Sequence, residues 1–267
     1  MTEAFDANRR LWEEWAALHP DTEFYDLAGF KRGGVRIRGY EIEHVGPVAD
    51  KDLLHLHCHF GIDSLSWARL GARVTGVDYS ANAIETATAL AAELGLDARF
   101  VESDIYKLPE VLEGEFDVVY ASRGVLSWLP ALGPWMKVAA DFLRPGGIFY
   151  LNEIHPVTYV FDDEGPTDLR IKFPYFELDE PLRLETEGSY ADPTADIKEK
   201  FVYGWNHSLG ETVTAVVGAG LQLEFLQEFP FLEWPLPFLE ERDGAWWLPE
   251  GTPELPLSFS LKAIKPF

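Results

Sequence analysis

The segment from Leu53 to Ser80, LLHLHCHFGIDSLSWARLGARVTGVDYS, constrains the fold most, because it reads as a strand, a tight turn, a helix and a second strand. An apolar run leads into a turn at Gly61, and either Asp63 or Ser64 can cap a helix that ends at Gly71. This order of elements is typical of the first unit of an open parallel α/β sheet.

The second strand of this unit delivers Asp78 to its carboxyl end, where ligands bind in such sheets and where an acid can accept both hydroxyl protons of a ribose. The turn has Gly61 but lacks the G-x-G-x-x-G of a dinucleotide site, and the chain has no G-x-x-x-x-G-K-[ST] phosphate loop. A ligand with a ribose but without a phosphate is therefore favoured, and S-adenosylmethionine is the commonest of these.

The chain then continues as alternating helices and strands at short intervals. We expect helices over 81–94 and 134–143 and strands over 98–102, 116–121 and 148–153, with the turn Arg144-Pro145-Gly146-Gly147 before the last of them. Such alternation predicts a parallel sheet with right-handed crossovers.

With these motifs in place, the chain resembles the class I S-adenosylmethionine-dependent methyltransferases over residues 50–154, and again over 210–228 and a final strand near 257–263. Together with His155-Pro156 and the WNHSLGE of residues 205–211, the first segment is similar to a bacterial group that methylates small molecules. The resemblance implies a Rossmann-like α/β fold. Its seven-stranded, mostly parallel sheet would have helices on both faces and an antiparallel last strand.

The resemblance also implies the cofactor and its site. Gly61 would pass under the methionine part of S-adenosyl-L-methionine, Asp78 would bind the ribose and Asp104 the adenine amino group. The predicted cofactor site is completed by Phe60, Tyr79, Ser103, Ile105 and Ser122.

One departure from the family pattern concerns His55, His57 and His59, which take the places of an acid and of two glycines. A metal site is the alternative for this H-x-H-x-H run, since alternate residues of a strand share a face. Neighbouring histidines on one face would stand 6 to 7 Å apart at about 3.3 Å per residue, too far to converge on one ion. We therefore expect no metal.

Two histidines are candidate general bases for methyl transfer, because imidazole is the usual base near neutral pH. His155 follows the fifth strand, and His207 precedes the last helix. The structural alternative is that His155 orients a turn and that His207 anchors an inserted flap. Tyr25, Ser127 and Trp128 are expected to line the substrate pocket.

We expect one methyltransferase domain over 1–267, with two additions to its core. Residues 1–50 would form an N-terminal cap that starts with an amphipathic helix, and 51–154 the cofactor-binding core. Residues 155–205 would form an inserted antiparallel flap with strands near 172–178, 182–190 and 200–203. The remaining 206–267 would complete the core and carry an aromatic loop.

Composition narrows the possible partners. A net charge of −23 disfavours nucleic acids, whose binding depends on neutralising phosphates with lysine and arginine. The start of the chain lacks the features of a secretory signal, and no apolar run approaches the roughly 20 residues that span a bilayer. With a single cysteine, Cys58, the chain fits a reducing compartment, so a cytoplasmic enzyme is expected.

Two other functions stay open at this stage. A protein that binds the cofactor without turnover would explain the altered glycine turn, and it predicts no open pocket beside the methyl group. A nicotinamide-dependent oxidoreductase shares the strand-turn-helix-acid layout but requires the missing glycine fingerprint. The sequence does not predict an oligomeric state.

Overall fold

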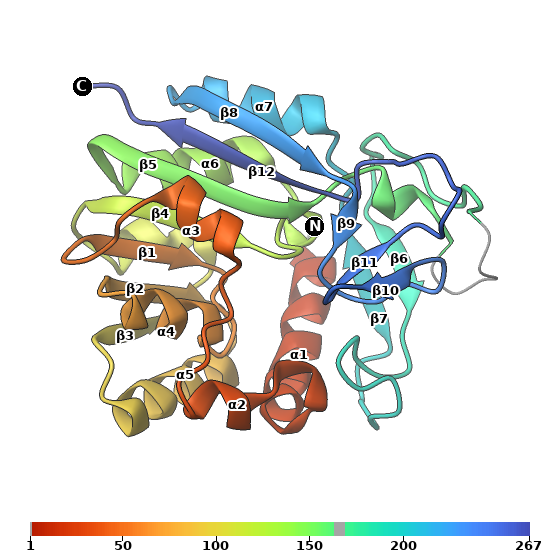
Figure 1. Ribbon diagram of the computed structural model, residues 1–267, viewed down its shortest axis with the longest axis horizontal. Coiled ribbons are helices and arrows are strands. Elements are labelled where there is room, and N and C mark those ends of the chain that lie inside the picture. Colours follow the sequence, from red (N-terminus) through yellow and green to blue (C-terminus); the bar gives the residue numbers. More distant parts are fainter. Residues whose placement is uncertain (1, 163–168) are drawn as a thin grey trace.

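The computed structural model describes residues 2–162 and 169–267, and a seven-stranded sheet of order β3-β2-β1-β4-β5-β12-β8 forms its centre (Figure 1). The strands of this sheet are β1 (Asp52–Leu56), β2 (Arg73–Asp78), β3 (Ala98–Glu102), β4 (Phe116–Ser122), β5 (Leu143–Ile154), β8 (Gln222–Phe229) and β12 (Ser258–Ile264). Strands β1 to β5 pair in parallel, whereas β12 runs antiparallel to both β5 and β8. The predicted fold class is confirmed.

Helices cover both faces of this sheet (Figure 1). They are α1 (Thr2–Leu18), α2 (Leu27–Lys31), α3 (Gly39–Val45), α4 (Ile62–Arg69), α5 (Ala81–Leu94), α6 (Leu132–Asp141) and α7 (Leu209–Gly218). Val45 of α3 and Trp67 of α4 pack on Leu53 and Val74 at one face. On the other face, side chains of α6 and α7 pack on Leu54 and its neighbours. Because successive residues of β1 point to opposite faces, the strand is buried on both sides.

Local details differ from the expected ones in two helices. Gly61, in a left-handed conformation with φ 84°, is the N-cap of α4, so the expected caps Asp63 and Ser64 lie inside its first turn. Helix α6 begins at Leu132, two residues before the expected start, because Pro134 needs no hydrogen-bond partner in a first turn. Helix α5 and strand β3 have the expected bounds.

Two small antiparallel sheets extend the core on the right of Figure 1. The first pairs β6 (Leu182–Glu185) with β7 (Phe201–Gly204), and the second has the order β10-β11-β9, from Glu240–Arg242, Ala245–Trp247 and Phe231–Leu232. The expected strand over 172–178 is wrong. Among the described residues, no strand pairs with that segment, and an isolated bridge between Phe161 and Ile171 precedes it.

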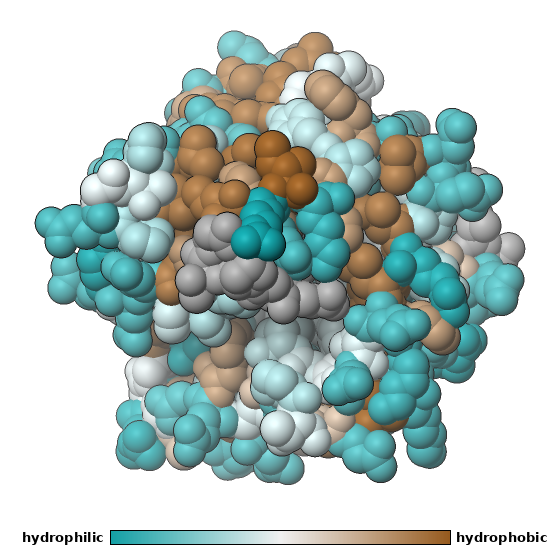
Figure 2. All heavy atoms as spheres, turned by 90° about the vertical axis from the view of Figure 1, so that its right-hand side faces the viewer, coloured by the Kyte–Doolittle hydropathy of each residue, from teal (hydrophilic) through white to brown (hydrophobic). Residues whose placement is uncertain are grey.

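The face that these sheets form carries hydrophobic atoms among hydrophilic ones (Figure 2). Among the described residues of this inserted segment, Ile171, Phe176, Leu178 and Tyr190 are the exposed large hydrophobic side chains. In the part of the chain that the structure describes, no helix is both long and apolar enough to cross a membrane.

Helix α1 joins the core to the flap through two successive carboxylates. Glu13 accepts hydrogen bonds from the backbone N–H groups of Ala81 (2.7 Å) and Asn82 (3.0 Å) and from the hydroxyl of Ser80 (3.0 Å), at the N-terminus of α5. Glu14 accepts from the backbone N–H groups of residues 198 and 199 in the flap, at 2.6 and 3.0 Å. The helix therefore holds the flap over the end of β2.

We predict that Glu13→Ala lowers the stability of the protein, because it removes the acceptor for two N–H groups at the start of α5. Loss of such a cap costs about 1–2 kcal/mol, which corresponds to roughly 2–8 °C in Tm for a chain of this size. Thermal unfolding followed by circular dichroism measures the change, with Glu3→Ala at an exposed position of α1 as the matched control. Equal Tm values for the two variants would contradict this role of Glu13.

Candidate functional site

The turn between β1 and α4 keeps a glycine-like backbone although histidines occupy two of its positions. His57, His59 and Gly61 have φ values of 58°, 50° and 84°, so every second residue of the turn is left-handed. A side chain in this region costs roughly 1–2 kcal/mol per residue. An added Cβ at Gly61 would lie 2.9 Å from both Ala87 and Phe100, so a glycine is needed there. The turn is strained where glycines were expected.

A ring nitrogen of each of the three histidines lies within hydrogen-bond distance of another side chain. His55 Nδ1 lies 2.8 Å from Ser64 Oγ, and His57 Nε2 accepts from the indole N–H of Trp135 at 3.1 Å. His59 Nε2 lies 2.8 Å from His19 Nδ1, on the loop after α1.

The environment of these histidines sets their charge. Burial lowers the pKa of His55 and of His57 to about 3, and the pKa of His59 lies well below 6.5 for the same reason. All three are neutral at physiological pH. Among the described residues, no three His, Cys, Asp or Glu side chains group closely enough to hold a metal ion.

A cavity of about 770 Å³ lies at the carboxyl ends of β1, β2 and β4. Its volume is within the range of small-molecule sites. Its wall contains most of the predicted cofactor residues, namely Phe60, Gly61, Asp78, Tyr79, Ser103, Ile105 and Ser122, and also the predicted substrate residues Tyr25, Ser127 and Trp128. Asp104 is not part of this wall, and its carboxylate accepts from the backbone N–H of Tyr106 at 3.0 Å. The structure thus brings together ten of the residues singled out from the sequence.

Asp78 closes the end of β2 and binds the strained turn. Its Oδ2 accepts from the backbone N–H of His59 at 2.9 Å, and its Oδ1 accepts from that of Ser80 at 3.0 Å. Burial raises the pKa of Asp78 to about 6, although these N–H groups oppose the rise. A buried carboxylate that keeps lone pairs toward the cavity is suited to accept hydroxyl protons.

Aromatic rings form another side of the cavity. The rings of Trp12 and Trp128 lie 5.1 Å apart, centroid to centroid, and Trp12 lies 5.2 Å from His59. Tyr25 and Tyr190 join the N-terminal cap to the flap through a hydrogen bond between their hydroxyl groups. Trp12 and Tyr190 were not among the predicted site residues, because the sequence does not show which aromatic residues of the cap and flap face inward.

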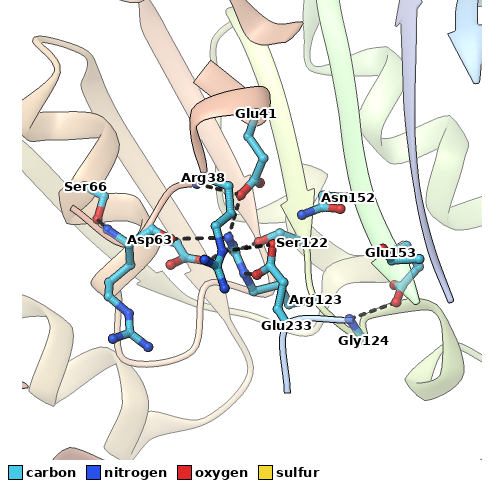
Figure 3. A network of polar contacts seen from close by, with 12 residues as sticks. Arg38, Glu41, Asp63, Ser66, Ser122, Arg123, Gly124, Asn152, Glu153 and Glu233 are labelled. Carbon is cyan, nitrogen blue, oxygen red and sulfur yellow. Dashed lines mark hydrogen bonds and ion pairs between the residues drawn. The ribbon is translucent and has the colours of Figure 1, made fainter. Parts of the chain in front are cut away.

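Arg123 is the charged centre at the other end of the cavity (Figure 3). It follows β4 with φ 64°, and its guanidinium contacts the carboxylates of Glu41, Asp63 and Glu233. Arg38 also lies 3.5 Å from Glu233. Burial raises the pKa of Glu41. For Glu233, Arg123 and Arg38 outweigh burial and hold its pKa below the usual value.

Sequence reasoning did not find this cluster. The sequence contains one indication of it, Ser122-Arg123-Gly124 at the end of a strand. The acids that contact Arg123 could not be identified, because they lie in three separate segments, α3, α4 and the loop after β9.

Glu153 fixes the loop that carries Arg123. Its carboxylate accepts four backbone N–H groups, from Gly124 (2.8 Å), Val125 (2.7 Å), Leu126 (2.9 Å) and Ile154 (2.6 Å). Figure 3 shows the first of these hydrogen bonds. Burial raises the pKa of Glu153 to about 7 against the effect of these donors. The loop after β4 is therefore held by a carboxylate of the neighbouring strand β5.

The two histidines predicted as general bases lie outside this cavity wall. His155 Nδ1 accepts from the backbone N–H of Val157 at 3.1 Å, and its Nε2 lies 2.9 Å from a carboxylate oxygen of Glu228 on β8. His207 donates from Nε2 to the carbonyl oxygen of Leu129 at 2.7 Å. His155 directly follows β5, but this strand begins at Leu143, five residues before the expected start, and includes residues 144–147, which were expected to form a turn. Neither histidine lines the cavity, which supports the structural alternative for both.

A family model described as a methyltransferase domain matches residues 53–147. A ubiquinone biosynthesis O-methyltransferase of Albidiferax ferrireducens is 31% identical over 136 residues, which cover 49% of this chain and 54% of that protein. A protein of the same name from Serratia proteamaculans is 28% identical over 138 residues, covering 50% and 57%. The chain thus spans about half the length of these curated relatives.

The fold is also similar to solved structures. An S-adenosylmethionine dependent methyltransferase from Mesorhizobium loti matches with a TM-score of 0.58 at 17% identity, over 88% of this chain and 99% of that chain. The segment matched by the family model contains β1, its turn, Asp78 and the end of β4, which together build the cavity wall. Residues 53–147 are thus similar to a methyltransferase domain, and the chain as a whole has the fold of S-adenosylmethionine-dependent methyltransferases.

Proposed function

We propose that this protein is an enzyme that transfers the methyl group of S-adenosyl-L-methionine to a small-molecule acceptor. The observation that carries the proposal is the buried carboxylate of Asp78, which faces a cavity of about 770 Å³ at the carboxyl end of β2. A carboxylate at this place in a parallel sheet is suited to bind a ribose.

The cavity fits the rest of the cofactor. Ser103 and Ile105 lie in the wall beside the end of β3, where an adenine next to the ribose would lie. His55 Nε2 and His59 Nδ1 are buried, belong to wall residues, and have no hydrogen-bond partner among the described residues. Buried polar atoms without partners are costly, so a polar ligand in this cavity would stabilise them.

The cofactor supplies a methyl group that its sulfonium already activates. The residues of this chain then have to align the acceptor and exclude water. The rings of Trp12, Tyr25, Trp128 and Tyr190 shield the cavity, and aromatic faces attract cations. We include the cap and the flap in the proposed site for this reason.

The acceptor has space of its own. Beyond the predicted cofactor residues, the cavity extends to Gly124, Ile154, Tyr159 and Trp234. A protein that only bound the cofactor would not need an open space of this kind, so the shape of the cavity favours transfer over binding alone.

The weak basicity of the histidines in the cavity wall favours an acceptor that loses its own proton readily. His55 and His57, with pKa values of about 3, are weak bases at neutral pH, and His155 and His207 lie elsewhere. An acidic hydroxyl, such as that of a phenol, can lose its proton without a strong base. The O-methyltransferases among the relatives make oxygen the first acceptor atom to test.

The net charge of −23 and the single cysteine support a cytoplasmic enzyme without nucleic-acid partners.

Calorimetric titration with S-adenosylmethionine, S-adenosylhomocysteine and NAD tests the cofactor. We expect micromolar binding of the first two and none of NAD, followed by transfer of labelled methyl groups to a panel of phenols. Binding of NAD alone would support an oxidoreductase instead.

We predict that Asp78→Asn weakens S-adenosylhomocysteine binding by at least tenfold, because an amide cannot accept both ribose hydroxyl protons. Hydrogen bonds to a charged group are each worth roughly 1.5–3 kcal/mol. Calorimetry measures the change, and Asp117→Asn, which alters a carboxylate paired with Arg144 at the opposite end of β4, is the control. Affinity within twofold of the wild type would remove Asp78 from the site.

The raised pKa of Asp78 predicts a pH dependence of cofactor binding. Only the ionised carboxylate accepts from both hydroxyls, so affinity should be constant above about pH 7 and fall roughly tenfold for each pH unit below 6. Titrations between pH 5 and 8 check this, and the Asp78→Asn variant should lack the dependence. A wild-type affinity that stays constant down to pH 5 would contradict the prediction.

The stability of the ligand-free protein should change in the opposite direction. Because the pKa of Asp78 rises from 3.8 to about 6 on folding, its contribution to the free energy of unfolding is complete below pH 3.8. That contribution, roughly 3 kcal/mol, is lost as the pH rises through 6. Urea unfolding of both proteins at pH 5 and pH 8 isolates the effect of Asp78 from that of other groups. An equal difference between wild type and Asp78→Asn at the two pH values would argue against it.

A further inference from the structure

The amino-acid end of the proposed cofactor needs a counter-charge that the turn after β1 does not supply. S-adenosylmethionine carries a charged α-ammonium group at the end opposite its adenine. His55 stands where the family pattern has an acid, and burial keeps this imidazole neutral. A neutral side chain at this position leaves the α-ammonium group of the ligand without an acidic hydrogen-bond partner from the turn.

The order of the strands indicates where that end of the ligand would lie. Ser103 and Ile105 mark the adenine side at β3, and Asp78 marks the ribose at β2. Because the sheet order is β3-β2-β1-β4, a ligand that continues in the same direction crosses β1 and reaches the end of β4. Strands β2 and β4 are two strand spacings apart, about 10 Å.

Asp63 is placed at this end. It lies in the first turn of α4, lines the cavity, and its Oδ2 is 3.3 Å from the hydroxyl of Ser122 at the end of β4. The same oxygen accepts from the guanidinium of Arg123 (Figure 3). In the described part of the chain, the other carboxylate oxygen, Oδ1, has no hydrogen bond, so it is available to a ligand.

The charges around Asp63 neutralise its carboxylate only in part. Glu41, Asp63 and Glu233 share the guanidinium of Arg123, and Arg38 lies near Glu233. Arg36 also lines the cavity, and burial raises the pKa of Glu41, so the negative charge available to a ligand depends on Asp63, which shares Arg123 with two other acids. A carboxylate that shares its arginine with two others is only partly neutralised, and it can accept a further charge-assisted hydrogen bond.

We propose that Asp63, held by Arg123 and Ser122, binds the α-ammonium group of the cofactor and replaces the acid that is absent at position 55. The inference rests on the proposed function. It assigns to α4 a binding role that the turn after β1 would otherwise have.

Binding measurements with two matched ligands test this without any assay of activity. The ligands are S-adenosylhomocysteine and its analogue that lacks only the α-amino group. We expect wild-type protein to bind S-adenosylhomocysteine at least tenfold more tightly than the analogue. Asp63→Asn should weaken S-adenosylhomocysteine binding by roughly 10- to 100-fold and leave the affinity for the analogue unchanged.

The control variant is Asp117→Asn, because Asp117 is also a partly exposed aspartate paired with an arginine, Arg144, but lies at the opposite end of β4. It should change neither affinity. Melting temperatures of all variants establish that they fold, and Asp63→Ser serves as a second variant if the asparagine disturbs the Arg123 cluster.

Three results would overturn the proposal. Equal wild-type affinities for the two ligands would show that the ammonium group has no acidic partner, whether or not any variant folds. A loss of affinity for both ligands by the same factor in Asp63→Asn would show general damage to the cavity. Unchanged affinity for S-adenosylhomocysteine in a folded Asp63→Asn protein would exclude this residue. Failure of the wild type to bind either ligand would instead refute the proposed function itself.

Discussion

The hydrogen bond from the backbone N–H of His59 to the carboxylate of Asp78 is the contact on which the site depends. It joins the turn after β1 to the end of β2. Each of the two partners by itself raises the free energy of the folded state. The turn holds two histidines in left-handed conformations, and the carboxylate is buried with a raised pKa. Backbone strain and a buried charge persist only where the surrounding structure over-determines them. The packed strands β1 and β2, with α4 and α5 beside them, provide that support.

The cover of the site depends on a different kind of contact. Helix α1 is bound through side-chain carboxylates to backbone N–H groups on both sides, at the start of α5 by Glu13 and in the flap by Glu14. Such contacts are directional, so they fix the position of the helix as well as its distance from the core. The same helix places Trp12 in the cavity wall, and the flap adds Tyr190. The aromatic side of the cavity thus exists only when three distant segments are assembled.

Strands and helices between residues 50 and 154 could be predicted from the sequence because buried parallel strands are short apolar runs with turn residues between them. Asp78 could be predicted because chain order alone places it at a strand end. The Arg123 cluster could not, since Glu41 and Glu233 reach it from segments whose packing the sequence does not reveal. The direction of His155 was equally hidden. It follows the register of β5 against β12, in which Ile154 pairs with Ser258, and this register is a property of the assembled sheet.

The three histidines of the turn change the chemistry of the site more than its shape. The backbone of His57 and His59 follows the path expected of glycines, so the turn still passes beneath the cavity. Their side chains add ring nitrogens to the wall, and desolvation keeps these rings uncharged. A neutral wall cannot balance an ammonium group, whereas the carboxylates around Arg123 can. Arg123 is shared among three acids, and with Arg38 it holds the pKa of Glu233 below its usual value. The negative charge needed for a zwitterionic ligand has therefore moved from the strand to the first turn of the helix that follows it.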